Sequence, residues 1–122
     1  MRKGALSEAV ALIKAVSSAL LAQPFTAAST AGAELRRACG DLSANAEAYI
    51  RAGALGDPMQ ACFAAAGDAG MTEDAFARVR GSLVTMQMRF NVGRAVQVMA
   101  SRLALAAECS ALADATMTSR GE

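Results

Sequence analysis

Alanine constrains the fold of this 122-residue chain more than any other feature, because it makes up a quarter of the sequence. Alanine loses the least conformational freedom on entering a helix and is therefore the best helix former. The chain contains only two prolines, and its aromatic residues are scarce. Its length is that of one compact domain. We therefore expect an all-α fold in which residues 1–122 form a single helical domain.

Apolar spacing and helix-end signals divide the chain into about five helices, packed as a compact bundle. The clearest stripe recurs every three or four residues and consists of Phe76, Val79, Leu83, Met86 and Phe90. The last helix has Val96, Met99, Leu103 and Leu112 among its apolar positions. The expected helices span approximately residues 5–22, 29–52, 58–66, 73–90 and 92–117.

Three helix boundaries carry specific predictions. Gly40 lies inside the second span, where we expect one helix weakened at this glycine; the alternative is two short helices broken there. Asp57 followed by Pro58 has the pattern of a capping carboxylate and a proline at the first helical position. Thr72 is expected to cap the helix over 73–90 through its side-chain oxygen.

The apolar residues are mostly small, which favours helix packing between proteins as much as within one. Hydrophobic residues make up 54% of the chain, but alanine buries little area compared with leucine or phenylalanine. Small side chains also let helices approach each other closely. An alanine-lined face therefore suits a partner's helix as well as the chain's own.

The chain has no histidine, so the commonest general base, metal ligand and neutral-pH proton switch is missing. Enzymes without histidine use paired carboxylates, lysine or tyrosine, but the chain has only Lys3, Lys14 and Tyr49 besides its acids. No glycine pattern matches a phosphate-binding loop. We therefore expect no enzyme activity, no cofactor, no metal and no small-molecule substrate. A thiol-dependent or carboxylate-dependent catalyst is the enzymatic alternative.

Three cysteines, Cys39, Cys62 and Cys109, are far apart and form no C-x-x-C motif. This spacing predicts neither a zinc site nor a thioredoxin-like motif. Three arrangements stay open: buried small apolar side chains, one internal disulfide with one free thiol, or cross-links between subunits.

Charge is nearly balanced overall, at +1, but it is unevenly distributed. Residues 34–74 are mainly acidic, whereas residues 75–107 contain arginines and no acid. The arginines of the second segment are candidate interface residues, because the planar guanidinium pairs well with carboxylates. The two segments either neutralise each other within the fold or meet between subunits, in the head-to-tail contacts that build rings. The candidate interface residues are Arg78, Arg80, Arg89, Arg94 and Arg102.

Neither nucleic acid nor a membrane is an expected partner. The total charge is not strongly basic, and no aromatic side chains alternate with the arginines. Residues 5–22 follow Arg2 and Lys3 as the apolar part of a signal peptide would, but Glu8 and Lys14 interrupt them and would be costly in a bilayer. We interpret this segment as an amphipathic helix.

The final stretch, residues 103–120, reads LALAAECSALADATMTSR. It resembles the alanine-rich helical region of the DNA circularisation proteins encoded in the tail-gene cluster of Mu-like phages, where L-x-L-A-x-E runs into T-x-T-S-R. That family has a domain before this region and further helices after it, and this sequence contains neither. The residues that carry the resemblance are Leu103, Leu105, Ala106, Glu108, Thr116, Thr118, Ser119 and Arg120.

The resemblance implies a structural protein of a phage virion, at the tail tip or baseplate, that is assembled in the host cytoplasm. Its partners would be other virion and tail proteins and copies of itself in a ring, contacted through packed helices. The alternative is a free helical adaptor or assembly chaperone that binds a partner helix in an apolar groove.

Overall fold

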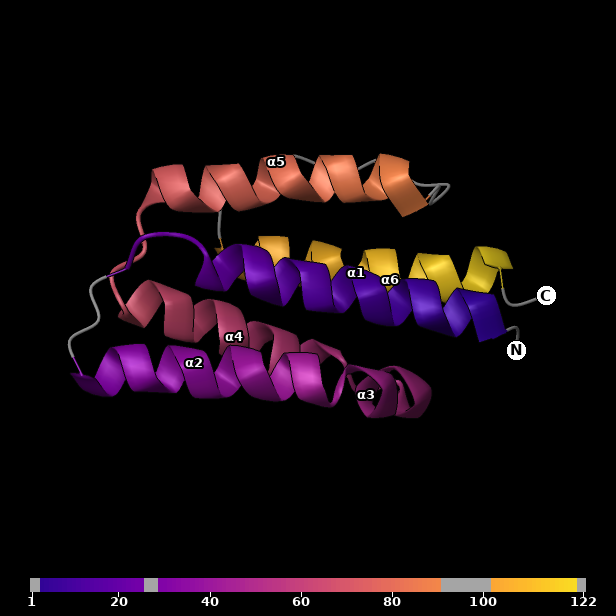
Figure 1. The fold of residues 1–122 in the computed structure, drawn as a ribbon, viewed down its shortest axis with the longest axis horizontal. Helices are drawn as coiled ribbons and strands as arrows, with labels where there is room; N and C mark the ends of the chain where they lie inside the picture. The colour runs from indigo at the N-terminus through magenta and orange to yellow at the C-terminus, as the bar shows by residue number, and fades with distance from the viewer. Residues whose placement is uncertain (1–2, 26–28, 91–101, 121–122) are drawn as a thin grey trace.

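The computed structural model describes residues 3–25, 29–90 and 102–120, and all regular secondary structure in these ranges is helical. This confirms the all-α class, with six helices where about five were expected. The bounds of the fifth helix are those predicted from its apolar stripe. The helices are α1 Lys3–Leu21, α2 Ser29–Ala44, α3 Ala46–Ala52, α4 Gly56–Asp68, α5 Glu73–Phe90 and α6 Arg102–Arg120 (Figure 1).

Four of the helices form a closed ring, and a further helix lies outside it. α1 packs on α2, α2 on α4, α4 on α6, and α6 again on α1. Neighbours in this ring run in opposite directions (Figure 1). α5 lies on the outer side of α1 and α6 and contacts both, whereas α3 extends beyond the end of α2 and contacts α1 (Figure 1).

The core consists of aliphatic side chains and alanines, with one large aromatic ring, Phe63, fully buried. Phe63 stacks against Phe76 with ring centroids 6.4 Å apart, which ties α4 to α5. Burying one large apolar side chain is worth about 1.5–3 kcal/mol. The largest fully buried side chains are those of Phe63, Leu12, Ile13, Leu20, Leu35, Leu42, Met59, Leu83, Leu105, Leu112, Val16 and Val79.

The predicted single helix over 29–52 is wrong, because the chain bends at Asn45 between α2 and α3. Gly40 is not the break and lies inside α2. The Asn45 side chain donates to the backbone oxygen and the carboxylate of Asp41, at 3.2 and 2.8 Å, which competes with regular helix geometry. Backbone hydrogen bonds continue across the bend, from Asn45 to Asp41 and from Tyr49 to Asn45.

Two further predictions need correction. α4 begins at Gly56, with Leu55 in the cap position and no side-chain cap bond, so Asp57 lies in the first turn and does not cap it. Leu103, expected among the apolar positions of the last helix, is 45% exposed. The part of that expected helix over residues 92–101 lies outside the described residues.

The predicted cap of α5 is confirmed: the Thr72 hydroxyl accepts a hydrogen bond from the backbone amide of Ala75 at 3.2 Å. Glu73 and Asp74 follow in the first turn, where the positive end of the helix dipole stabilises carboxylates. The turn before α5 is supported by Gly70 at φ 83°, a conformation that favours glycine.

The first helix is apolar enough to meet a membrane criterion. By length and composition alone, Gly4–Leu21 could cross a bilayer, a test that a signal sequence and the core helix of a soluble protein also pass. In the bundle, 44% of this segment is buried.

Candidate protein interface

A groove of about 360 Å³ lies between α1 and α3. Leu6, Val10 and Ala11 of α1 supply its apolar lining. Its other lining residues are Ser7, Lys14, Glu47 and Arg51.

The charged side of the groove combines one ion pair with one separate cation. Arg51 donates to the carboxylate of Glu47 at 3.1 Å, one turn apart on α3. Both side chains are more than half exposed, so this pair contributes little to stability. Lys14 is exposed on α1 and makes no ion pair with any residue that the structure describes.

The apolar spacing of α1 predicts a core face and does not by itself indicate the groove. Leu6 and Val10 share the spacing of Ile13 and Leu20, and that spacing predicts one core face. In the structure Ile13 and Leu20 are fully buried, whereas Val10 is half-buried at the groove. Glu8 and Lys14, which interrupt the apolar run over residues 5–22, were the sequence signals for the less buried side of this helix.

The five candidate interface arginines do not form one described cluster. Arg78 and Arg80 lie on α5 and Arg102 lies at the start of α6. Arg78 donates through Nε to the Gln23 side chain at 2.8 Å, joining α5 to the end of α1. The side chain of Arg89 and all of Arg94 lie outside the described part of the chain.

The position of the Arg102 side chain explains why residue 67 is a glycine. Its side chain lies across Gly67 of α4, and a Cβ at Gly67 would run into the guanidinium group. Gly67 therefore permits the close approach of this arginine to α4. The helix expected over residues 58–66 stops before Gly67, whereas in the structure Gly67 lies inside α4, one residue before its last.

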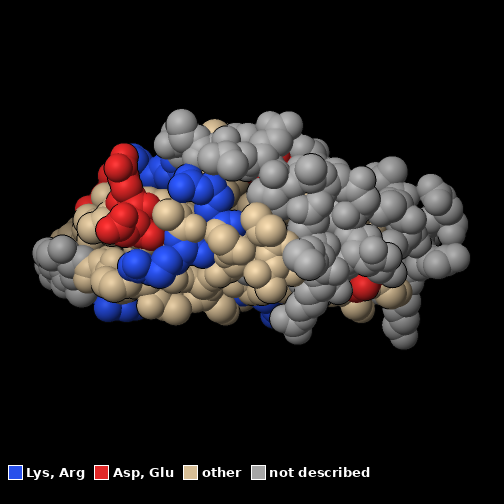
Figure 2. All heavy atoms as spheres, turned by 90° about the horizontal axis from the view of Figure 1, so that it is seen from above, with Lys and Arg blue, Asp and Glu red and all other residues tan. Residues whose placement is uncertain are grey.

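The acidic and basic segments both contribute to the surface on the α5 side. Figure 2 shows that acidic and basic side chains gather together toward one end of the α5 side. Glu73 and Asp74 begin the same helix that carries Arg78 and Arg80. This surface is therefore mixed in charge where it is described.

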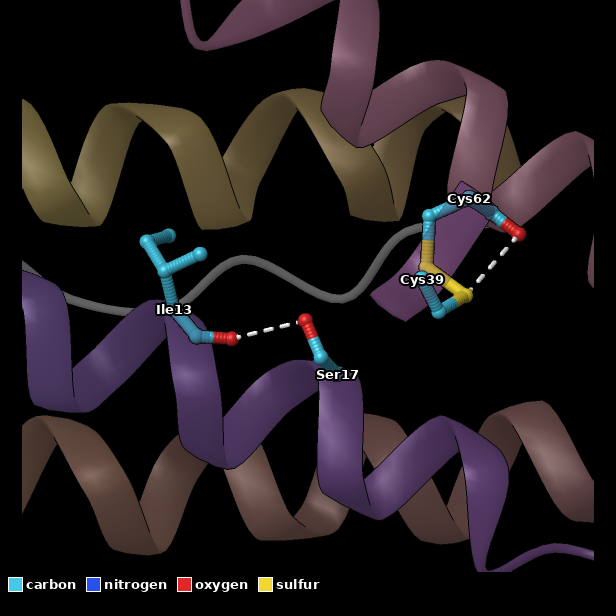
Figure 3. The surroundings of a disulfide bond; sticks show 4 residues. All are labelled: Ile13, Ser17, Cys39 and Cys62. Carbon is cyan, nitrogen blue, oxygen red and sulfur yellow. Dashed lines mark hydrogen bonds between the residues drawn. A yellow bond between two sulfur atoms is a disulfide. The ribbon is translucent and has the colours of Figure 1, made fainter. Parts of the chain in front are cut away.

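Two of the three cysteines form a disulfide. Cys39 of α2 and Cys62 of α4 are bonded, with their Cα atoms 4.7 Å apart, and both side chains are fully buried. Ile13 and Ser17 of α1 lie beside the bridge, and the Ser17 hydroxyl donates to the Ile13 carbonyl oxygen at 3.0 Å (Figure 3). One internal disulfide with one free thiol was among the arrangements left open by the sequence.

The free thiol, Cys109, is buried in α6. Burial, together with the smaller effect of the neighbouring Glu108 carboxylate, raises the pKa of Cys109 to about 12. Because the thiolate is the reactive form, a thiol with this pKa is inert near neutral pH. In the part of the chain that the structure describes, no group of three or more potential metal ligands occurs.

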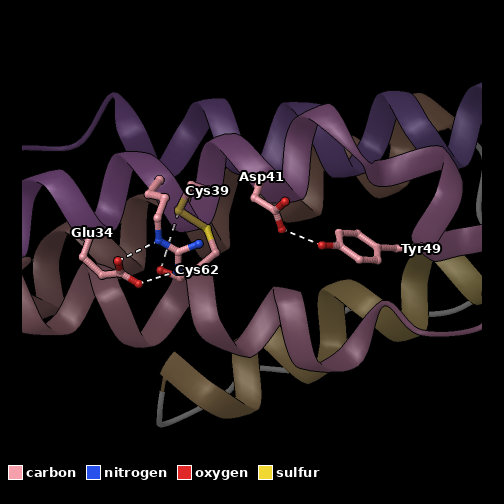
Figure 4. A network of polar contacts seen from close by, with 6 residues as sticks. Glu34, Cys39, Asp41, Tyr49 and Cys62 are labelled. Carbon is pink, nitrogen blue, oxygen red and sulfur yellow. Dashed lines mark hydrogen bonds and ion pairs between the residues drawn. A yellow bond between two sulfur atoms is a disulfide. The ribbon is translucent and has the colours of Figure 1, made fainter.

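A network of polar contacts lies on the outer side of α2 and α3 (Figure 4). Arg37 donates two hydrogen bonds to Glu34, at 2.8 and 2.6 Å, and these bonds lower the pKa of the carboxyl group. The Tyr49 hydroxyl donates to Asp41 at 2.5 Å, which raises the pKa of Tyr49. The Tyr49–Asp41 contact joins α3 to α2, whereas the Arg37–Glu34 pair lies within α2.

Comparisons with known proteins add no relative. No family model, no curated protein and no solved structure matches the chain.

Proposed function

We propose that the protein is a structural component of a phage virion, at the tail tip or baseplate, and that it acts by packing its helices against neighbouring proteins. The observation that carries the packing function is the groove between α1 and α3, which is lined by Leu6, Val10 and Ala11 of α1 beside charged side chains of both helices. The resemblance of residues 103–120 to the phage family supports the setting.

The structure distinguishes two kinds of residue within that resemblance. Leu105, Glu108 and Thr116 are buried, and the Thr116 hydroxyl donates to the Leu112 carbonyl oxygen at 2.8 Å. These positions serve the chain's own bundle. Leu103 is exposed at the start of α6 and is available to a neighbouring protein.

Quantification of the chain in purified particles tests this proposal. We expect it in a fixed ratio to a major tail protein, retained after washing at high salt, because packed apolar contacts do not weaken with screening. Particles that are complete and infectious without the chain would contradict a structural role.

The open groove also favours a second candidate function, that of an adaptor or assembly chaperone which holds a partner helix. Recognition of an amphipathic helix by an apolar groove is a recurrent binding mode. An adaptor would be found bound to its partner before assembly and would be absent or scarce in finished particles. The same quantification therefore separates the two candidates.

A further inference from the structure

The Cys39–Cys62 bridge lies where three helices of the ring meet. It joins α2 to α4, and Ile13 and Ser17 of α1 lie beside it (Figure 3). The side chains of both cysteines and of Ile13 are fully buried, and Ser17 is buried as well. In a close-packed core the neighbours of a side chain leave no spare space around it. A change in volume at the bridge therefore acts on α1, α2 and α4 together.

Reduction of the bridge increases the volume that this part of the core must hold. Two thiols that are not bonded stay a van der Waals contact apart, so they need more room than a bridge. The Cα atoms of Cys39 and Cys62 are 4.7 Å apart, toward the short end of the range of about 4.4–6.8 Å that bridges span. Extra volume in a filled core displaces the backbone or forces side chains out of their preferred rotamers. We therefore expect reduction to move α2 away from α4 and to loosen its contact with α1.

α3 should move with α2, because hydrogen bonds make the two helices one continuous unit. Backbone hydrogen bonds run across the bend, from Asn45 to Asp41 and from Tyr49 to Asn45. The Tyr49 hydroxyl also donates to the Asp41 carboxylate (Figure 4). A displacement of α2 at the bridge is therefore carried to α3, whose Glu47 and Arg51 line the groove.

The bridge is also close to the α1 wall of the groove. Ile13, which lies beside the bridge, is followed by Lys14 and comes about one turn after Val10. Val10 and Lys14 both line the groove. Both walls of the groove are thus connected to the same pair of sulfur atoms.

We propose that Cys39 and Cys62 are a redox latch. In the reduced chain the unit of α2 and α3 is held loosely against α1 and α4. A single oxidation by a small-molecule disulfide then fixes this unit, and with it the groove that α3 forms with α1.

The oxidation proceeds by thiol–disulfide exchange. The thiolate of one cysteine attacks the small disulfide, forms a mixed disulfide and releases one small thiol. The second cysteine attacks the protein sulfur of the mixed disulfide, which completes the bridge and releases the second small thiol. The two protein thiols thus lose two electrons and two protons, and the small disulfide is reduced to two thiols.

The latch closes more easily than it opens. Exchange needs access to a sulfur atom, and both bridge sulfurs are buried, so exchange in either direction waits for α2 and α4 to separate. The bridge itself makes this separation rarer, because it closes the loop between the two helices. Cys109 offers no internal thiolate to attack the bridge near neutral pH, because its pKa is raised to about 12. Once formed, the bridge therefore persists in reducing solution while the protein stays folded.

Where the latch controls the groove, it rests on the packing function proposed above. Cytoplasmic cysteines stay reduced, so a chain made in the cytoplasm folds in the loose form and is fixed after it leaves the cell. The two proposals are separable in experiment, because the latch is measured on the purified chain and the virion role in particles. A chain without a redox response that is nevertheless found in particles would contradict only the latch.

Hydrogen exchange of the full chain in its reduced and oxidised forms tests the latch. We expect amides of α3 to exchange between about tenfold and about 100-fold faster in the reduced form, the upper value being the effect of closing a loop of this size. Amides of α5, which packs on the outer side of α1 and α6 (Figure 1), are the internal control and should exchange equally in both forms.

Two cysteine variants assign the response to the bridge. Cys39→Ala with Cys62→Ala should give fast exchange in α3 that neither dithiothreitol nor oxidised glutathione changes. The matched control is Cys109→Ala, which makes the same substitution at a buried cysteine outside the bridge and should keep the full redox response.

Treatment of the oxidised protein with dithiothreitol tests the one-way character. Alkylation followed by mass spectrometry should show that the folded protein keeps the bridge at least about tenfold longer than the protein in urea, because reduction waits for opening of the fold.

Four results would overturn the latch. The first is equal exchange of α3 in the reduced and oxidised forms, and the second is equally fast reduction of the folded and unfolded protein. The third is loss of the redox response in Cys109→Ala, which would assign it to the third cysteine. The fourth is a reduced wild type without helical content by circular dichroism, since the bridge would then be a requirement for folding and not a latch.

Discussion

At the scale of single residues, the burial of the three cysteine sulfur atoms predicts how the protein reacts with an alkylating reagent. Cys39 and Cys62 are bonded and Cys109 is enclosed in the core with a pKa near 12. We expect no alkylation of the native protein, one adduct after unfolding without reductant, and three after unfolding with reductant. Mass spectrometry counts the adducts. Rapid labelling of the folded protein would contradict the buried position of Cys109.

The same thiol predicts how stability changes at alkaline pH. The pKa of Cys109 is raised from 9.0 in the unfolded chain to about 12 in the folded one, so folding favours the protonated thiol. Its contribution is complete below pH 9.0 and is lost as pH rises toward 12. Urea unfolding should therefore show a steeper loss of stability above pH 9.0 for the wild type than for Cys109→Ala. Parallel pH profiles for the two proteins would contradict this origin.

Two glycines predict opposite effects of the same substitution. Gly40 is exposed inside α2 and a Cβ there meets nothing within 4 Å, so Gly40→Ala should stabilise the protein by about 1 kcal/mol. Gly53 ends α3 at φ 64°, where a side chain is strained, and Gly53→Ala should destabilise it by about 1 kcal/mol. Thermal unfolding measures both, and a shift in the same direction for the two variants would contradict the assigned backbone conformations.

At the scale of helices, the disulfide joins α2 to α4 across a sequence separation of 23 residues. Closing a loop of this size lowers the entropy of the unfolded chain by an amount worth about 3 kcal/mol. Cys39→Ala with Cys62→Ala should therefore lower the unfolding free energy by about this amount and keep the helical content. Denaturant unfolding with and without reductant provides the comparison. If reductant left the unfolding free energy of the wild type unchanged after a cycle of unfolding and refolding, the bridge would be contradicted.

Helices were predictable where local signals acted alone. The stripe from Phe76 to Leu83 and the cap at Thr72 depend on neighbouring residues, and both predictions are confirmed for the described residues. Asp57 and Pro58 form an equally good local signal, but Leu55 is buried and places the start of α4 earlier. Tertiary packing thus moves a boundary that capping chemistry alone would set elsewhere.

The candidate interface was less predictable from the sequence, because it depends on which helix faces are covered by other helices of the bundle. The spacing of Leu6 and Val10 indicates an apolar face but not whether the bundle covers it. The packing of α3 and of the other helices against α1 decides that, and this packing depends on contacts between segments distant in the sequence. Arg102 illustrates the same limit: its place in a basic segment is visible in the sequence, but its position over Gly67 is a result of the packing of α6 on α4.

At the scale of the whole molecule, α5 differs from the other long helices in its surroundings. α1, α2, α4 and α6 each have two neighbours in the closed ring, whereas α5 packs on the outside of α1 and α6 (Figure 1). Within its described side chains, Ala75, Val79 and Leu83 are buried and the opposite side faces solvent. Because local opening costs less where fewer apolar contacts break, α5 should open without disrupting the ring.

Hydrogen exchange tests this hierarchy. Amides of α5 should exchange faster than those of α4, although α4 is the shorter helix, because α4 is held in the ring and also by the Cys39–Cys62 bridge. Val79→Ala should accelerate exchange in α5 and leave α4 nearly unchanged, while Met59→Ala should accelerate exchange throughout the ring. Equal protection of α4 and α5, or a Val79→Ala effect that spreads equally to α4, would mean that all the helices unfold as one cooperative unit.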